Sequence, residues 1–289
     1  MPELPEVETI ARGLASRVTG DVIESVWLGS KPEPLKSKAS EIVATLESKR
    51  IAGVRRVGKH IVFDLENGGR ASSPVRRKAR QKPSSTVTPR STSAQWIVHL
   101  GMTGRMLVCN PDQAIEKHTH AVAKLASGRE LRFVDPRRFG RLSVARGFEA
   151  AGSEPLEVDL NSFVLLFRGR KTPIKSALLN QKLLSGVGNI YADESLFRAG
   201  IRPRRRAASL TRQELSQLFG TVQQVLKEAI ALGGSSVSDY VDADGEEGFF
   251  QLQHRVYGRE GEPCLVCKTP IKRLVIAGRS SHYCPKCQK

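Results

Sequence analysis

Four of the five cysteines of this chain fall into two C-x2-C pairs near its end, and this spacing strongly limits what that part can form. The pairs are Cys264 with Cys267 and Cys284 with Cys287, and sixteen residues separate them. Two such knuckles bring four thiolates around one tetrahedral Zn2+. Disulfides are the alternative, and a reducing cytosol disfavours them. We therefore expect one structural Zn2+ bound by these four cysteines, and a buried, small apolar role for Cys109.

The charge balance is the second constraint. Lys and Arg together number 46, Asp and Glu number 29, and the net charge is +17. Such an excess points to a polyanionic partner, of which nucleic acid is the commonest. A generally basic composition and an anionic membrane surface are the alternatives, but no long basic amphipathic helix supports the second. Because we find no signal-peptide pattern and no long apolar run, we expect a soluble, intracellular protein with no membrane partner.

The first half of the chain combines one helix with strands. Apolar residues at helical spacing predict a helix over residues 5–18. Gly58 before Lys59 marks a turn between two strands. The stretches with a strand pattern are residues 22–65, 95–108 and 121–145.

Residues 70–94 differ from this pattern, because they carry seven basic side chains and no acid. Such a composition cannot form a core, so we expect a disordered basic loop there. We interpret it as a tolerated insertion. A nonspecific electrostatic tether to nucleic acid is the functional alternative.

The second half of the chain is helical. A stretch rich in Gly, Pro and acidic residues predicts a hinge linker over residues 151–160. Thr211 and Glu214 form a capping box at the start of the longest helix. The predicted helices are residues 174–184, residues 189–199 and about residues 211–232.

A polar loop over residues 233–248 precedes the cysteine module at residues 257–289. We expect this module to hang from a hairpin of two strands, with Ile271, Leu274 and Val275 as its small core. The layout is then a β-rich domain, a hinge, a helical domain and a zinc hairpin. A cleft between the two domains would suit a nucleic-acid duplex.

Motifs along the whole chain resemble those of the formamidopyrimidine-DNA glycosylases. The chain opens on MPELPEVET at residues 1–9. The other motifs are GKH at 58–60, HLGMTG at 99–104, DPRRFG at 135–140, GVGNIYADE at 186–194 and YGREGEPC at 257–264. Any one could arise by chance, but their common order, closed by the four-cysteine module, makes the resemblance specific.

This resemblance implies an α+β, two-domain fold. Its first domain, residues 1–150, would be a β-sandwich with an N-terminal helix. Its second would be a helix-two-turn-helix domain over residues 161–256, with a β-hairpin zinc finger at 257–289. The implied activity is excision of oxidised purines, chiefly 8-oxoguanine and formamidopyrimidines, from damaged double-stranded DNA, followed by β,δ-elimination. The loop at 233–248 resembles the family's lesion-covering loop.

The resemblance assigns catalysis to Pro2, Glu3, Lys59 and Arg279. Once Met1 is removed, Pro2 offers a secondary amine that can attack C1′ of the deoxyribose and form an iminium, which is an electron sink. An α-amine titrates at about 7.7–8.0, so a neutral fraction exists near pH 7. Glu3 would transfer protons at the opening sugar. Lys59 and Arg279 would grip phosphates, and Lys59 would also aid elimination.

The resemblance also places a set of residues around the DNA. Met102, Arg137 and Phe139 would fill the gap left by the flipped nucleotide, and Arg137 would read the orphaned cytosine. Simpler roles stay open. They are core packing for Met102 and Phe139, a solvated lysine, a helix N-cap or, for Glu6, helix-dipole compensation beside organising the N-terminus. The full set is Glu6, His99, Met102, Arg137, Phe139, Lys175 and Asn189.

Two other functions stay open. One is the sister activity, an endonuclease VIII-type glycosylase for oxidised pyrimidines. The other is a noncatalytic zinc-dependent DNA-binding protein. We expect a monomer in the bacterial cytoplasm, associated with the nucleoid. His118 and His120 could form a metal pair, but ordinary hydrogen-bonded histidines are the preferred interpretation, because no second pair accompanies them.

Overall fold

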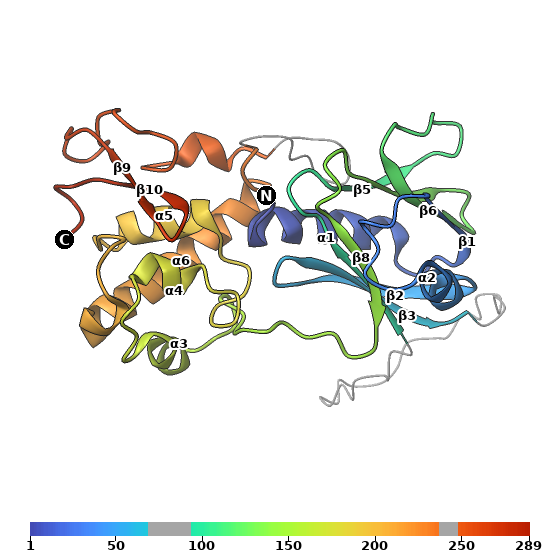
Figure 1. Cartoon of the computed structure of the whole chain (residues 1–289), viewed down its shortest axis with the longest axis horizontal. Helices are drawn as coiled ribbons and strands as arrows, with labels where there is room; N and C mark the ends of the chain where they lie inside the picture. Colours follow the sequence, from blue (N-terminus) through green and yellow to red (C-terminus); the bar gives the residue numbers. More distant parts are fainter. Residues whose placement is uncertain (69–93, 237–247) are drawn as a thin grey trace, which may run out of the picture.

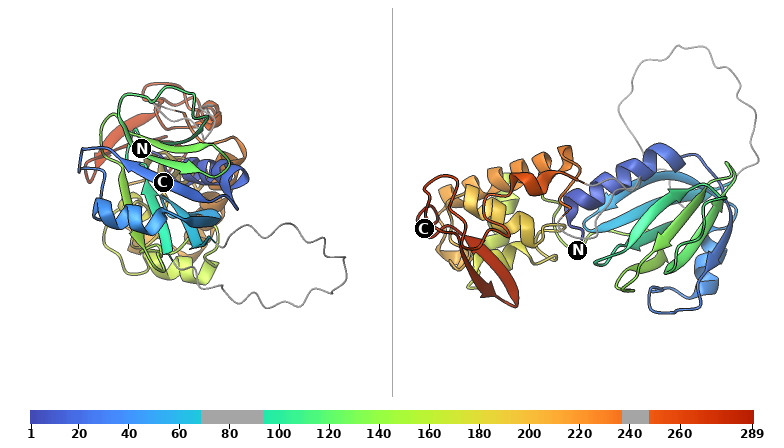
Figure 2. Two further views of the ribbon diagram at one scale, coloured as in Figure 1. Left: turned by 90° about the vertical axis from the view of Figure 1, so that its right-hand side faces the viewer. Right: turned by 90° about the horizontal axis from the view of Figure 1, so that it is seen from above.

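The computed structural model describes residues 1–68, 94–236 and 248–289. These residues form two lobes, and the amino terminus lies at the junction between them (Figures 1 and 2). The predicted basic loop lies outside the described residues except for Ala94, which instead opens a strand. Residues 237–247 of the predicted covering loop also lie outside them. Among the described helices, none combines the length and apolar character that crossing a bilayer requires.

Helix α1 (Leu4–Val18) contributes to both lobes. Its predicted stripe of Val7, Ile10, Leu14 and Val18 is buried in the core of the first lobe. Leu4, one turn earlier, packs instead into the core of the second lobe. The helix begins with a capping box, in which the side chains of Glu3 and Glu6 each accept a hydrogen bond from the backbone N–H of the other. The first turn of α1 is therefore shared between the two lobes.

The first lobe is a sandwich of two antiparallel four-stranded sheets, with the orders β1-β6-β7-β5 and β2-β3-β4-β8. Their inward side chains form one core with α1, in which Phe63 stacks on Trp96 with ring centroids 4.9 Å apart. The predicted turn at Gly58 joins β2 to β3. The strands are β1 (Ile23–Leu28), β2 (Lys49–Val57), β3 (His60–Asn67), β4 (Ala94–His99), β5 (Arg105–Cys109), β6 (Thr119–Leu125), β7 (Glu130–Val134) and β8 (Arg141–Ala145).

Helix α2 (Ala39–Leu46) corrects the prediction that residues 22–65 consist of strands. The helix buries only Ile42 and Leu46. Two buried positions in eight residues are too few to distinguish helical spacing from the alternation of the neighbouring strands. Cys109 is buried, as expected.

The second lobe is a helical domain around its own core. The predicted capping box at Thr211 and Glu214 begins the longest helix. One helix was missed: α3 starts at Leu160, inside the predicted linker, where Asp159 accepts hydrogen bonds from two backbone N–H groups. The elements are α3 (Leu160–Phe167), α4 (Ile174–Leu178), α5 (Asn189–Arg198), α6 (Arg212–Ala231) and the short 3-10 turns η1 (Ala207–Ser209) and η2 (Phe250–Gln253).

The predicted helix at 174–184 is too long, because α4 ends at Leu178. The side chain of Asn180 accepts a hydrogen bond from the N–H of Lys182 at 3.0 Å, which favours a turn over another helical turn. Leu184 is still buried, but within this turn. Helix α5 does begin at Asn189, yet Gly188 is its N-cap, so the N-cap interpretation of Asn189 was wrong.

The cysteine module is built on the antiparallel hairpin of β9 (Lys272–Ile276) and β10 (Arg279–Tyr283). Ile271 is buried, as predicted, whereas Val275 is 56% exposed. Side chains alternate along a strand, so Val275 lies on the opposite face from its neighbours Leu274 and Ile276. Ile276 takes the core position that was predicted for Val275.

Candidate active site

The carboxylate of Glu3 lies at the start of helix α5. It accepts hydrogen bonds from the backbone N–H groups of Ile190, at 3.1 Å, and Tyr191, at 3.5 Å. Free N–H groups at a helix start stabilise an anion. Burial nevertheless raises the pKa of Glu3, against the opposing effects of Lys59 and these N–H groups. The result is a buried carboxyl group that holds a proton more readily than usual.

Gly188 makes this approach possible. A Cβ atom at Gly188 would lie 2.1 Å from Cδ of Glu3. The φ angle of Gly188 is −127°, which any residue can adopt, so the requirement for glycine comes from the close approach alone.

Glu6 holds the amino terminus against the second lobe. Its Oε2 accepts from the N–H of Glu3 at 2.7 Å, and its Oε1 accepts from the N–H of Ser235 at 2.8 Å and from the hydroxyl of Tyr191. Burial and the charge of Glu3 raise the pKa of Glu6 to about 7. Glu6 is 2% exposed, which suits a role in organising the N-terminus rather than contact with DNA.

Pro2 and Lys59 are buried beside this carboxylate pair. Burial lowers the pKa of Lys59, the charges of Glu3 and Glu6 oppose this, and the charge of Arg279 adds to it. The predicted residues Glu3, Lys59 and Arg279 come from three separate parts of the chain, and their charges act on one another. We call them the electrostatic cluster. Arg279 itself is exposed at the start of β10.

Lys175 is not a solvated lysine, and sequence analysis missed its partner. Its Nζ lies 2.6 Å from Oδ1 of Asp193, and both side chains are fully buried. The same Nζ donates to the carbonyl of Ser280 at 2.6 Å. The N–H of His282 donates to Oδ2 of Asp193 at 2.8 Å. Lys175 and Asp193 therefore anchor β10, which carries Arg279, to helices α4 and α5.

Asn189 adds to the same anchor. Its Nδ2 donates to Oγ of Ser280 at 3.3 Å. Glu194, also without a predicted role, is fully buried and accepts hydrogen bonds from the N–H groups of Arg255, Val256 and Tyr257, the segment leading into the cysteine module. Tyr191 and the two acids lie within the GVGNIYADE motif, so the motif itself was the available signal.

His99 has one ring nitrogen that accepts a hydrogen bond and one that can donate. Its Nδ1 accepts a hydrogen bond from the N–H of Gly101 at 3.1 Å. Burial, together with the charges of His60, Lys59 and Arg141, lowers its pKa to about 4. A neutral imidazole that accepts at Nδ1 carries its proton on Nε2. The Nε2–H of His99 can therefore donate to a phosphate oxygen, although the ring carries no positive charge near pH 7.

Met102 and Phe139 project from two loops and are 40% and 48% exposed. Arg137 lies over the ring of Phe139, with its Cζ 4.9 Å from the ring centroid. Asp135 joins the two loops, because its carboxylate accepts from Oγ1 of Thr103 at 2.6 Å and from the N–H of Gly140 at 2.7 Å. Exposure of these apolar side chains argues against core packing and leaves them free to contact a ligand.

The four predicted zinc ligands meet at the open end of the hairpin, before β9 and after β10. Their Sγ atoms all lie within 4.8 Å of one another. The Cys264–Cys287 and Cys267–Cys284 distances are 3.9 and 3.4 Å. A tetrahedron with Zn–S bonds of about 2.3 Å has edges of about 3.8 Å, whereas a disulfide requires about 2.05 Å. The site therefore fits one structural Zn2+, which holds the two knuckles together.

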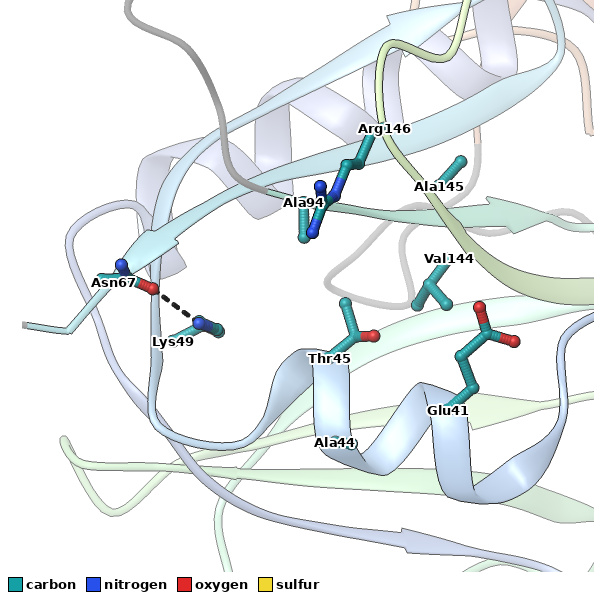
Figure 3. A pocket seen from close by; sticks show the side chains of 9 residues that line it. All are labelled: Glu41, Ala44, Thr45, Lys49, Asn67, Ala94, Val144, Ala145 and Arg146. Carbon is teal, nitrogen blue, oxygen red and sulfur yellow. Dashed lines mark hydrogen bonds between the residues drawn. The ribbon is translucent and has the colours of Figure 1, made fainter.

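Two other features do not belong to this site. His118 is exposed, while Nε2 of His120 bonds the carbonyl oxygen of Asp135 at 2.9 Å, so the two histidines do not form a metal pair. A cavity of about 570 Å³ lies beside α2, between Glu41, Lys49 and Arg146 (Figure 3). Its lining includes none of the predicted site residues, so its size alone does not make it the active site.

Comparison with known proteins assigns all three parts of the chain. The sequence model of the formamidopyrimidine-DNA glycosylase N-terminal domain matches residues 1–142, and that of the same family's H2TH domain matches residues 151–241. The zinc finger found in FPG and IleRS matches residues 261–289. This chain belongs to the formamidopyrimidine-DNA glycosylase family.

Individual members of the formamidopyrimidine-DNA glycosylase family resemble the chain over its whole length. The formamidopyrimidine-DNA glycosylase of Solibacter usitatus is 42% identical, with 100% of both chains covered. The crystal structure of the MutM (FPG) protein from Thermus thermophilus is 39% identical with a TM-score of 0.81, covering 99% of this chain and 98% of that one. A Lactococcus lactis FPG mutant bound to Fapy-dG containing DNA is 30% identical with a TM-score of 0.84, covering 100% of both chains.

Glu6→Gln should flatten the dependence of stability on pH. The folded-state pKa of Glu6 is about 7 against an ordinary value of 4.5. Between these values the folded protein binds more protons than the unfolded chain, so stability falls as pH rises, by up to roughly 3 kcal/mol. Denaturant unfolding at pH 5 and pH 8 should show a smaller difference for Glu6→Gln than for wild type. Parallel curves would contradict this, and Glu24→Gln on exposed β1 is the control.

Removing zinc should release the two cysteine knuckles and leave the two larger cores folded. We expect one zinc per chain by atomic absorption, and its loss in Cys267→Ser, because a tetrahedral thiolate site needs all four ligands. Limited proteolysis should then cut within residues 257–289 first. The matched variant Cys109→Ser should retain its zinc. Full zinc content in Cys267→Ser would show that the four cysteines are not the ligands.

Proposed function

We propose that this chain is a bifunctional DNA glycosylase and abasic-site lyase of base excision repair, which removes 8-oxoguanine and formamidopyrimidines from duplex DNA. The observation that carries the proposal is the buried Glu3 carboxylate, adjacent to Pro2 in the chain, coupled to Lys59 and seated at the start of α5. Family membership supports it, and so does the related structure from Lactococcus lactis, whose DNA contains Fapy-dG.

Pro2 is the proposed nucleophile once Met1 is removed. Met1 is 47% exposed, so an aminopeptidase can reach it, whereas Pro2 is buried next to the carboxyl cluster. The freed secondary amine attacks C1′, the base departs with the C1′–N bond electrons, and the sugar ring opens to give an iminium on Pro2. The iminium then accepts electrons as the 3′ and 5′ phosphates leave in turn by β- and δ-elimination.

Glu3 is proposed to move protons in these steps. Its raised pKa lets the carboxyl group protonate the ring oxygen of the sugar as the ring opens. The resulting carboxylate can remove a proton from C2′ during β-elimination. Two N–H groups of α5 stabilise this carboxylate, and Lys59 faces it with a positive charge. One residue can therefore act as acid and then as base.

The basic and amide side chains around Glu3 are proposed to hold the DNA backbone. Lys59 and Arg279 supply positive charge, and His99 and Asn189 supply neutral donors. Lys175 acts differently, because Asp193 and Ser280 already hold its ammonium group. We assign Lys175 to positioning β10, and hence Arg279, rather than to direct contact with DNA.

The exposed loop residues are proposed to replace the flipped nucleotide. Met102 and Phe139 offer apolar surface to the neighbouring base pairs, and Arg137 offers hydrogen-bond donors to the cytosine left behind. The guanidinium of Arg137 is already oriented by the ring of Phe139, which lowers the entropy lost on binding.

The proposed function also implies a division of the chain into domains. We assign residues 1–150 to the β-sandwich domain, 151–160 to the hinge, 161–256 to the helix-two-turn-helix domain and 257–289 to the zinc finger. We also propose a monomer that acts in the bacterial cytoplasm on damaged double-stranded DNA of the nucleoid. The net charge of +17 suits this polyanionic partner.

Oxidised pyrimidines are the second candidate substrate. A related structure, a complex of the wild-type Lactococcus lactis FPG (MutM), is described as holding oxidized pyrimidine containing DNA. A noncatalytic DNA-binding protein is the third candidate, and the Pro2 and Glu3 arrangement disfavours it.

Borohydride trapping tests the function directly. A duplex with one 8-oxoguanine opposite cytosine should become covalently linked to chain that lacks Met1, and digestion should locate the reduced adduct on Pro2. Chain that retains Met1 should bind the same duplex but give neither adduct nor strand cleavage, because its proline nitrogen is an amide. An adduct on a lysine, or full activity with a blocked terminus, would remove Pro2 from the mechanism. The yield of adduct with duplexes that contain thymine glycol or dihydrouracil shows whether oxidised pyrimidines are also substrates.

A further inference from the structure

A row of basic and imidazole side chains crosses the outward face of the β2-β3-β4-β8 sheet. His60 on β3 pairs with His99 on β4, which in turn pairs with Arg141 on β8. Residues directly opposite each other in antiparallel strands point to the same face of a sheet. Lys36 continues the row, because its N–H donates to the carbonyl of Leu142 in β8 at 2.8 Å and its side chain lines the same cavity as the other three.

This row borders a cavity of about 340 Å³. The four side chains of the row line it together with Ile97, Ser143 and Phe148. The volume is well above the share of about 30 Å³ that one water molecule takes in the liquid, so a group of several heavy atoms fits. The ring centroid of His60 lies 4.9 Å from that of His99 and 5.0 Å from that of Phe148. These three packed rings form one side of the cavity.

The charges in this cavity are not balanced by acids. The lining contains Lys36 and Arg141 but no carboxylate. Within the described ranges, neither cation forms an ion pair, and the guanidinium of Arg141 donates only to the carbonyls of Arg138 and Gly140. Asp64, further along the same face, is already bonded by Arg55 and Gln95. A concave, positively charged surface of this kind favours an anion.

The cavity also adjoins the proposed catalytic cluster through one shared residue. His99 lines the cavity, and the charges of both Lys59 and Arg141 act on its ring. Its Nε2–H is free to donate, because Nδ1 is the atom that accepts from Gly101. The side chain of His99 therefore lies between the phosphate grip proposed at Lys59 and the cations of the cavity.

We propose that the cavity bordered by Lys36, His60, His99 and Arg141 is a further phosphate subsite, which takes a backbone phosphate of the damaged strand beside the one gripped at Lys59. This assignment rests on the proposed function. Arg141 and Lys36 supply the charge, and His99 supplies a neutral donor. The subsite extends the DNA-binding track across the β-sandwich lobe, away from the zinc hairpin.

Salt dependence of binding tests the subsite. The slope of log K against log salt is negative, and losing one phosphate contact makes it shallower by about 0.9. The double variant Lys36→Gln/Arg141→Gln should make this slope shallower by about one for a duplex with 8-oxoguanine opposite cytosine, and weaken binding about tenfold at moderate salt. The matched control Lys49→Gln/Arg146→Gln removes the same charge from the cavity of Figure 3. Equal changes in both pairs would overturn the proposal.

A scan of single phosphates gives the position. Each phosphate of the damaged strand is replaced in turn by an uncharged methylphosphonate. One replacement next to the lesion should weaken binding to wild type and have no further effect on the Lys36→Gln/Arg141→Gln variant, while Arg141→Lys should respond like wild type. If every replacement lowers the affinity of the wild type and of the double variant equally, no phosphate occupies the cavity.

Two controls separate this proposal from others. Inorganic phosphate alone should not shift the ring resonances of His60 and His99 at millimolar concentration. A shift without any change in the DNA salt slope would assign the cavity to free phosphate and overturn the DNA assignment. Failure of the proposed enzyme function appears separately, as absence of the borohydride adduct with wild type, whereas the salt slope and the methylphosphonate scan still judge the subsite.

Discussion

The contact between the Glu3 carboxylate and the start of helix α5 holds the structure together at its functional centre. Glu3 precedes a helix of the first lobe, yet its carboxylate accepts from N–H groups of the second. The N–H of Leu4 donates to the carbonyl of Gly186 at 3.0 Å, and the Leu4 side chain enters the helical core. The amino terminus, which carries the proposed nucleophile, therefore lies between the two lobes.

Around this contact, buried acidic side chains lie opposite buried lysines. The carboxyl groups of Glu3 and Glu6 face Lys59, and Lys175 faces Asp193. Removing charged groups from water is costly unless partners and hydrogen bonds compensate. Here compensation depends on the fold, because each lysine and the acid that it faces come from different segments of the chain. Burial raises the pKa of the two carboxyl groups and lowers that of Lys59, against the attraction between Lys59 and Glu3, and these directions suit proton transfer near neutral pH.

Elements with many regularly spaced apolar residues could be predicted from the sequence, and elements that depend on tertiary contacts could not. Helices α1 and α6 and the four-cysteine module follow from periodicity, capping and ligand spacing. Helices α2 and α3 are short, and Asn180 ends α4 early. The burial of Lys175 depends on Asp193, eighteen positions further on, and the row from His60 to Lys36 depends on strand register. Neither is visible in local composition. The motifs located the site, but they did not show which of its residues position others.

The substitution Gly188→Ala measures the central contact most directly. Its added Cβ would lie 2.1 Å from Cδ of Glu3, while the same change at Gly220 in α6 meets no atom within 4 Å. We expect Gly188→Ala to slow formation of the borohydride-trapped adduct by about 100-fold or more, the scale of lost acid–base catalysis. Its affinity for lesion DNA should stay close to that of Gly220→Ala, whereas its thermal unfolding temperature should be lower, because the displaced buried carboxylate loses its two backbone donors. Wild-type trapping rates in Gly188→Ala would contradict the account that Glu3 acts from the start of α5.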